Sequence, residues 1–286
     1  MRISAFLPCL TTKTTKNTIF LFKSKLLFRG VPNFLIRQVI LKLISFDNDI
    51  SSNNYNQILE CLDPLPDFLK ASPTTEALFG RRHLENVFLT SSGTISCKRV
   101  LFALKFVMND SKFCVILPRV TQLLLWFLKE HEVFTVLQVL LKESVERKDS
   151  FSMFFGRGLC QFSYIASVVL TFISARVKNP EGLMDDQIDS QANHEKSMVM
   201  RLVNDMTYHF LVGYISPEYY PIVLMYFIND GIGGFIRLVI ALVQGNYSMI
   251  RHFIRKNAGF ENFRSEFKHA LRTCFDITAL VKVIKN

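Results

Sequence analysis

Acidic residues are missing from the beginning of this 286-residue chain, where the first one is Asp47. The same stretch carries eight lysines and arginines, and a second excess of basic residues follows Arg251, so the formal net charge of +10 is unevenly placed. A chain that is basic at both ends favours an anionic partner such as a membrane surface, a phosphoinositide or a nucleic acid. A well-solvated surface that binds no ligand explains the same charge equally well.

Glycine and proline are also scarce, with 12 and 9 residues, whereas 49% of the residues are hydrophobic and 27 are phenylalanine. Few turn-forming residues over long apolar stretches favour helices over many short strands. No alternating strand pattern and no Asn-Gly hairpin signal stands out. The composition therefore predicts an all-α protein with a large core and excludes a disordered chain.

The sequence also lacks clusters of residues that commonly bind metal ions. The six cysteines include no Cys-x-x-Cys pair, and the six histidines form no His-Glu-x-x-His motif. No phosphate-binding glycine loop, catalytic triad or RNA-binding aromatic motif can be argued from the spacing of the other residues. The sequence therefore predicts no metal, no cofactor and no nucleic-acid partner, and its scattered thiols are typical of a cytosolic protein.

The segment 1–17 predicts a flexible N-terminus. Its apolar run is short and lacks a small-x-small cleavage pattern, which disfavours a secretory signal. An acid-free start with threonine and lysine also fits a mitochondrial transit peptide. A frayed end before the first helix fits the same residues.

Apolar residues that recur every three or four positions predict helices along the rest of the chain. A polar loop at 45–56 and an exposed linker at 178–196 are predicted between them. The predicted helical segments are 18–44 with an interruption near Gly30 and Pro32, 97–108, 117–148, 162–177, 198–215 and 263–275. The segment 117–148 predicts a helical hairpin with Pro118 in its first turn and a polar turn at 129–132.

The segment 219–243, YYPIVLMYFINDGIGGFIRLVIALV, is close in length to a membrane span. A span needs about 20 consecutive apolar residues, and a charge near its centre costs about 3 kcal/mol. Asn229, Asp230 and Gly231 interrupt the middle of this segment and favour the end of a helix. We therefore predict two core helices, at 219–228 and 234–243, that are each too short to cross a bilayer.

This segment, preceded by VGYISPE, resembles the closing part of the TBC domain, the fold of Rab GTPase-activating proteins. Upstream, FCVILPRVTQLLLWFLKEHEVFTVLQVLL, DPLPDFL and LFRGVPNFLIRQVILKLI resemble other parts of that domain in the same order, so the resemblance extends over roughly 26–280. The nearest similarity is to the Skywalker-like TBC/TLDc subgroup, known for vesicle trafficking, and it covers the TBC part of that subgroup only. The resemblance implies one all-α Rab-GAP/TBC-like helical domain at 18–286.

Catalytic members of this family use an arginine finger in an Ile-x-x-Asp-x-x-Arg motif and a glutamine finger in a Tyr-x-Gln motif. At the corresponding places, Arg81 and Arg82 have no aspartate three residues earlier, and KFCVILP contains no Tyr-x-Gln. The resemblance therefore implies the fold without a catalytic pair, and we assign no catalytic residue. A displaced finger at Arg81 or Arg82 is the alternative.

Skywalker-like domains also carry a cationic pocket for a phosphoinositide headgroup, and the resemblance places Arg37 and Arg237 in it. Guanidinium groups suit phosphate because they present paired donors and stay charged. Arg237 has apolar sequence neighbours and needs a ligand, a carboxylate such as Asp230, or a route to the surface. Three further pocket positions depart from the family's basic residues, since they hold Asn33, Gly233 and Thr278.

The sequence thus predicts a catalytically degenerate TBC-domain protein that binds a Rab- or Arf-type small GTPase and phosphoinositide membranes in vesicle trafficking. The expected location is cytoplasmic and peripheral on vesicle or plasma membranes, without a transmembrane segment. Two alternatives remain open: an active Rab GTPase-activating protein with non-standard fingers, and a helical scaffold without a ligand.

Overall fold

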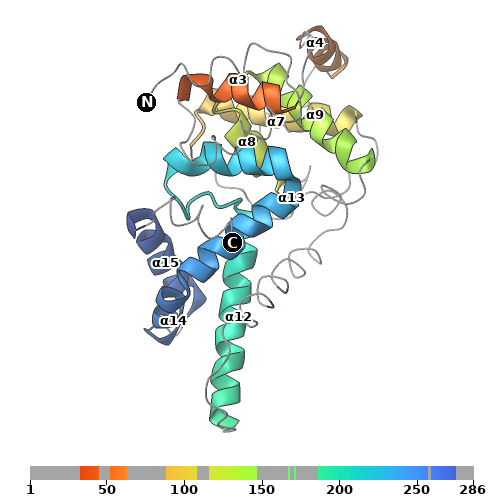
Figure 1. The fold of residues 1–286 in the computed structure, drawn as a ribbon. Coiled ribbons are helices and arrows are strands. Elements are labelled where there is room, and N and C mark those ends of the chain that lie inside the picture. The colour runs from red at the N-terminus through yellow and green to blue at the C-terminus, as the bar shows by residue number, and fades with distance from the viewer. Residues whose placement is uncertain are drawn as a thin grey trace, which may run out of the picture. The chain divides into compact units, whose positions relative to one another are not determined.

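Helices form the regular structure of this protein (Figure 1). The structure, a computed structural model, describes residues 33–44, 52–62, 88–107, 116–146, 167, 171, 186–256 and 259–274. These residues contain no β-strand, only an isolated bridge between Val212 and Ile215. The predicted all-α fold class is therefore confirmed. Three predictions lie outside the described residues. They are the boundary between a flexible segment 1–17 and the domain, both candidate arginine fingers, and the helix at 162–177 apart from two of its positions.

The chain divides into two compact units. The first comprises Met1–Gly156 and Pro221–Gly231, and the second comprises Arg157–Tyr220 and Ile232–Asn286. The described helices of the first unit are α3 (Asn33–Leu43), α4 (Ser52–Cys61), α7 (Ser91–Val107), α8 (Leu117–Leu124) and α9 (Glu130–Glu146). Those of the second are α12 (Asp186–Tyr208), the short helix η2 (Pro217–Tyr219), α14 (Tyr247–Lys256) and α15 (Phe260–Cys274). α13 (Tyr220–Gly245) follows η2 and contributes to both units.

In the first unit, α7 packs against α8 and α9, and α4 packs against α7 and α9. The helical hairpin predicted around Pro118 is present as α8 and α9, with the proline in the first turn of α8. All eight residues of α8 are buried, so this helix forms the centre of the unit. The polar residues predicted as the hairpin turn, 129–132, mostly belong to the first turn of α9 instead, because acidic side chains are favourable at a helix N-terminus.

Two helices of the first unit begin in segments that the sequence did not predict as helical. α7 begins at Ser91, six residues before the predicted start, because Thr90 Oγ1 accepts the Gly93 N–H at 3.2 Å and caps the helix. α4 includes residues 52–56 of the predicted polar loop 45–56. This segment is helical because Tyr55 anchors it in the core. Tyr55 is only 3% exposed, and the centre of its ring lies 5.0 Å from that of Phe134.

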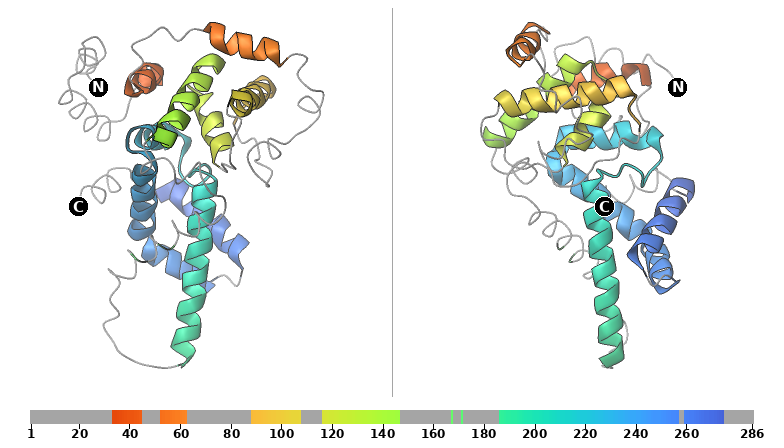
Figure 2. Two further views of the ribbon diagram at one scale, coloured as in Figure 1. Left: turned by 90° about the vertical axis from the view of Figure 1, so that its right-hand side faces the viewer. Right: turned by 180° about the vertical axis from the view of Figure 1, so that it is seen from behind.

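In the second unit, α12 packs against α14 and α15, and α14 packs against α15 (Figure 2). The long α12 corrects the predicted linker, because residues from Asp186 to Lys196 are helical; residues 178–185 lie outside the described part of the chain. Of the polar residues that suggested a linker, Asn193, His194 and Lys196 are exposed on this helix. Glu195 attaches this part of α12 to α14, because it accepts a hydrogen bond from Tyr247 Oη at 2.7 Å and pairs with Arg251 at 3.2 Å.

α12 ends in a tight turn with unusual backbone geometry. The Leu211 N–H donates to the Met206 carbonyl at 2.8 Å and the Phe210 N–H to the Thr207 carbonyl at 3.0 Å, which is the hydrogen-bond pattern of a Schellman cap. Phe210 and Leu211 have φ of 50° and 61°, in the left-handed region that usually favours glycine. Burial compensates, because both residues are 0% exposed and the Phe210 ring stacks on Phe235 at 4.6 Å.

α13 contains the interruption that the sequence predicted. Gly231 has φ 61° and ψ −150°, outside helical geometry, so the helix is broken where Asn229, Asp230 and Gly231 suggested a turn. The break is shorter than predicted, since residues on both sides stay helical. Within the described ranges, no helix is both long enough and apolar enough to cross a membrane.

Gly231→Ala is expected to lower the free energy of unfolding by about 1–3 kcal/mol, because its φ/ψ combination is nearly restricted to glycine. Gly233→Ala is the matched control. It lies two residues later on an exposed helical position with nothing within 4 Å of an added Cβ, and alanine there should stabilise the helix by roughly 0.5–1 kcal/mol. Urea unfolding measures both variants, and equal effects at the two positions would contradict the assignment of strain to Gly231.

Candidate functional site

Arg37, the first predicted site residue, lies on α3 among the buried residues Ile36, Val39 and Ile40 but points to the surface. Its side chain is 48% exposed. Its Nε donates to both carboxylate oxygens of Glu132 at 3.0 Å, and its Nη2 also contacts Glu132. The hydrogen bond and negative charge of Glu132 raise the pKa of Arg37 above its ordinary value. The sequence did not predict this pairing, which joins residues 95 positions apart.

Glu132 is the third residue of α9, and its side chain is only 3% exposed. Its Oε2 accepts the backbone N–H of Lys129 at 2.8 Å, as the acidic residue of a capping box does at a helix start. Burial alone would raise the pKa of Glu132, but the hydrogen bonds from Arg37 and Lys129 and the charge of Arg37 lower it below its usual value. The carboxylate is therefore ionised at neutral pH and fixed in place.

Glu130, in the same turn of α9, joins two further helices. Its Oε1 accepts a hydrogen bond from Tyr55 Oη of α4 at 2.6 Å and forms an ion pair with Arg99 Nε of α7 at 2.8 Å. Burial, followed by the hydrogen bond and charge of Glu130, raises the pKa of Tyr55. The first turn of α9 thus receives polar side chains from α3, α4 and α7.

Arg237, the second predicted site residue, lies on the part of α13 that belongs to the second unit. Its neighbours Phe235, Leu238 and Val239 are buried, whereas Arg237 itself is exposed. The apolar flanks therefore turn inward while the guanidinium reaches the surface, one of the alternatives left open by the sequence. Pairing with Asp230 lies outside the described side chains. Because Arg37 belongs to the other unit, joint binding of one headgroup stays a prediction.

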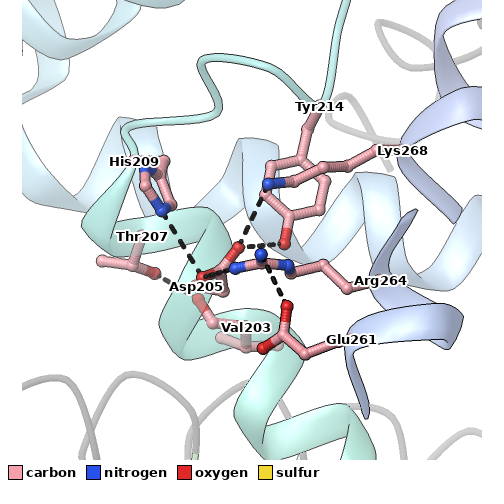
Figure 3. Close-up of polar contacts among 8 residues, drawn as sticks. All are labelled: Val203, Asp205, Thr207, His209, Tyr214, Glu261, Arg264 and Lys268. Atoms are coloured by element: carbon pink, nitrogen blue, oxygen red, sulfur yellow. Dashed lines mark hydrogen bonds and ion pairs between the residues drawn. The ribbon is translucent and has the colours of Figure 1, made fainter. Parts of the chain in front are cut away.

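A charged cluster surrounds Asp205 near the end of α12 (Figure 3). Its carboxylate accepts a hydrogen bond from Tyr214 Oη at 2.5 Å and one from Arg264 Nη1 at 3.1 Å, both side chains pointing towards it in the figure. His209 Nε2 and Lys268 Nζ each lie 3.5 Å from a carboxylate oxygen. Lys268 also lies 4.6 Å from the centre of the Tyr214 ring, a cation–π distance. Asp205 thus fastens α15 to α12.

The electrostatics of this cluster are those of a structural anchor. Burial alone would raise the pKa of Asp205, but hydrogen bonds from His209 and Tyr214 and the charge of Lys268 lower it well below its usual range. Burial, with the charge of Asp205, raises the pKa of Tyr214, and burial lowers the pKa of Lys268. A carboxylate held so firmly in its ionised form is a poor proton acceptor, so the cluster does not have the features of a general base.

Two of the three other positions of the predicted pocket, Asn33 and Gly233, lie in described helices. Asn33 is the first residue of α3, and Gly233 is an exposed residue of α13. Thr278, Arg81 and Arg82 lie outside the described residues. Among the residues that the structure does describe, no group of three or more histidine, cysteine or acidic side chains could hold a metal ion.

Comparison with protein-family models gives no match, and comparison with curated proteins gives none either. The crystal structure of the TBC domain of Skywalker/TBC1D24 from Drosophila melanogaster is similar to this chain, with a TM-score of 0.66 and 14% sequence identity over 100% of this chain and 90% of that one. A crystal structure of the same Drosophila domain in complex with inositol(1,4,5)triphosphate is similar with a TM-score of 0.48 and 15% identity, over 93% of this chain and 94% of that one. The first similarity establishes that this chain has a TBC-like, all-α fold.

Proposed function

We propose that this chain is a catalytically degenerate TBC-like domain that binds small GTPases of the Rab or Arf type. The observation that carries the proposal is a TBC-like fold over the whole chain, combined with a sequence that lacks both finger motifs. A TBC-like fold favours GTPase recognition, because the TBC domain is the fold of Rab GTPase-activating proteins. Fold alone does not fix the chemistry, which depends on the residues of the site.

The missing fingers argue against catalysis of GTP hydrolysis. An arginine finger neutralises charge that develops on the phosphoryl group, and a glutamine positions the attacking water. Neither Arg81 nor Arg82 has the motif's aspartate, and the region of KFCVILP has no Tyr-x-Gln. A domain without these groups still offers a binding surface, so binding without turnover is the function that the sequence favours.

The lipid part of the proposal rests on Arg37 and Arg237. Each is an exposed arginine on a helix that also carries buried apolar residues, so each guanidinium is held at the surface by a rigid element. Paired N–H donors and a permanent charge suit phosphate groups. We propose that each of them contributes to the binding of phosphoinositide headgroups, which would place the protein in the cytoplasm, peripherally on vesicle or plasma membranes, in vesicle trafficking.

The purified 286-residue protein is expected to bind one or more GTP-loaded Rab or Arf GTPases without accelerating hydrolysis. A panel of such GTPases tests this by biolayer interferometry for binding and by phosphate release for hydrolysis. An arginine finger supplied in trans accelerates hydrolysis by about 10³–10⁵-fold, so weak activity would be visible. Acceleration that disappears in Arg82→Ala would establish the alternative, an active GTPase-activating protein, and a lack of binding across the panel would favour the scaffold.

The double variant Arg37→Gln plus Arg237→Gln is expected to lose about 2 kcal/mol of vesicle affinity, since each basic residue near an anionic leaflet contributes about 1 kcal/mol. Co-sedimentation with phosphatidylcholine vesicles that contain phosphatidylinositol bisphosphate measures the loss. The matched control is Lys105→Gln plus Arg255→Gln, which removes one exposed charge from each unit as well. Equal losses in the two double variants would show diffuse attraction and would overturn the assignment of the site.

A further inference from the structure

The guanidinium of Arg37 is already engaged by a carboxylate of its own chain. Two of its three nitrogens contact Glu132, in a contact that joins α3 to α9. We propose that Glu132 is an intramolecular competitor that sets the affinity of Arg37 for phosphate groups. This inference rests on the proposed role of Arg37 in binding a phosphoinositide headgroup.

The position of Glu132 makes it a lasting competitor. Its side chain is 3% exposed and is tied to the Lys129 N–H at the start of α9, so it cannot turn away without loss of that cap. The Arg37 side chain, by contrast, is 48% exposed and long, and it can change its rotamer at low cost. An incoming phosphate therefore either draws Arg37 away from Glu132 or binds beside a fixed negative charge.

Both routes weaken phosphate binding. In the first, the phosphate must replace three contacts that Arg37 already makes with Glu132, and the buried carboxylate is left without its charged partner. In the second, the pair as a whole is neutral, so the attraction of the guanidinium is offset by repulsion from Glu132. The same arrangement favours phosphate groups that carry several charges over singly charged ones, because only a strong anion competes well with a carboxylate.

Glu132→Gln tests the inference as a gain of binding. A glutamine at this capping-box position can still accept the Lys129 N–H, so the helix start is retained while the competing charge is removed. The matched control is Glu130→Gln, which removes the same charge from the same turn but leaves the contact between Arg37 and Glu132. Phosphatidylcholine vesicles with phosphatidylinositol bisphosphate and soluble inositol trisphosphate are the two probes, and a gain restricted to vesicles assigns the ligand to the membrane.

We expect Glu132→Gln to bind at least one probe about fivefold more tightly than Glu130→Gln, because about 1 kcal/mol is a reasonable contribution for an ion pair whose arginine is half exposed. The gain should vanish in Glu132→Gln plus Arg37→Gln, because Glu132 acts through Arg37. If wild type binds but Glu132→Gln binds no better than Glu130→Gln, the competitor inference is wrong and the lipid proposal stands. If neither wild type nor Glu132→Gln binds either probe, both fail. Should Glu132→Gln not fold, Glu132→Asp, with a retracted carboxylate, is expected to show a smaller gain, and no gain there also overturns the inference.

Discussion

Asp205→Ala is expected to lower the free energy of unfolding by about 3–5 kcal/mol, because loss of one partner from a buried ion pair leaves the others uncompensated. The Asp205 side chain is 11% exposed and is contacted by Arg264, Lys268 and Tyr214 (Figure 3). Glu261, which also pairs with Arg264, has a side chain that is 69% exposed. Urea unfolding followed by circular dichroism measures the change. The effect should appear in the unfolding of the second unit, where α12 and α15 pack together.

Glu261→Ala is the matched control, since Glu261 pairs with the same Arg264 at 2.6 Å but its side chain is 69% exposed. Exposed ion pairs contribute less than about 1 kcal/mol, so this variant should be nearly neutral. The acid dependence provides a second check. The pKa of folded Asp205 lies below its unfolded value of about 3.9, so its contribution is complete above that pH and is lost as the pH falls. Wild type and Asp205→Asn should therefore converge in stability in acid, and a constant gap would contradict the anchor role.

Phe235→Ala is expected to cost about 3–5 kcal/mol, the range for removal of a buried aromatic side chain. Phe235 is 0% exposed, and its ring stacks on that of Phe210 with an angle of 1° between the planes. Phe210 has a left-handed backbone, so the same truncation also removes the packing that offsets its unfavourable φ. Thermal and urea unfolding measure the loss.

Phe106→Ala serves as the comparison, because Phe106 is 52% exposed and substitutions on the surface usually change stability by no more than about 0.5 kcal/mol. If Phe235→Ala were as mild as this control, the Phe210–Phe235 stack could not be what holds the end of α12. Wild-type melting behaviour in both variants would lead to the same conclusion.

Local sequence signals predicted those parts of the fold that depend on local chemistry. The break in α13 follows from Gly231, whose backbone geometry few other residues adopt, and the start of α8 follows from Pro118. Helix starts were predicted less well where polar residues precede the apolar pattern. Ser91 and Asp186 begin helices six and twelve residues before the apolar signal does, because capping and exposed helical turns need no apolar residues.

The candidate site shows a different limit. Arg37 and Arg237 were selected through the resemblance to Skywalker-like domains, and only Arg237 also drew attention by its apolar sequence neighbours. Their partners could not be selected, since Glu132 lies 95 positions from Arg37 and only the packing of α3 near α9 brings the two together. A weak signal for Glu132 existed in the sequence, as an acidic residue three positions after Lys129 at the start of an apolar run. The cluster at Asp205 had no comparable signal.

The shared use of Glu130 by Tyr55 and Arg99 has a consequence for how such sequences diverge. An uncharged residue at position 130 would remove a polar partner from α4 and from α7 at the same time. A substitution at one of the three positions therefore favours substitutions at the other two. Among descendants of a common ancestor with this arrangement, we expect the three to be inherited as a set or lost as a set, even though 75 positions separate the first from the last.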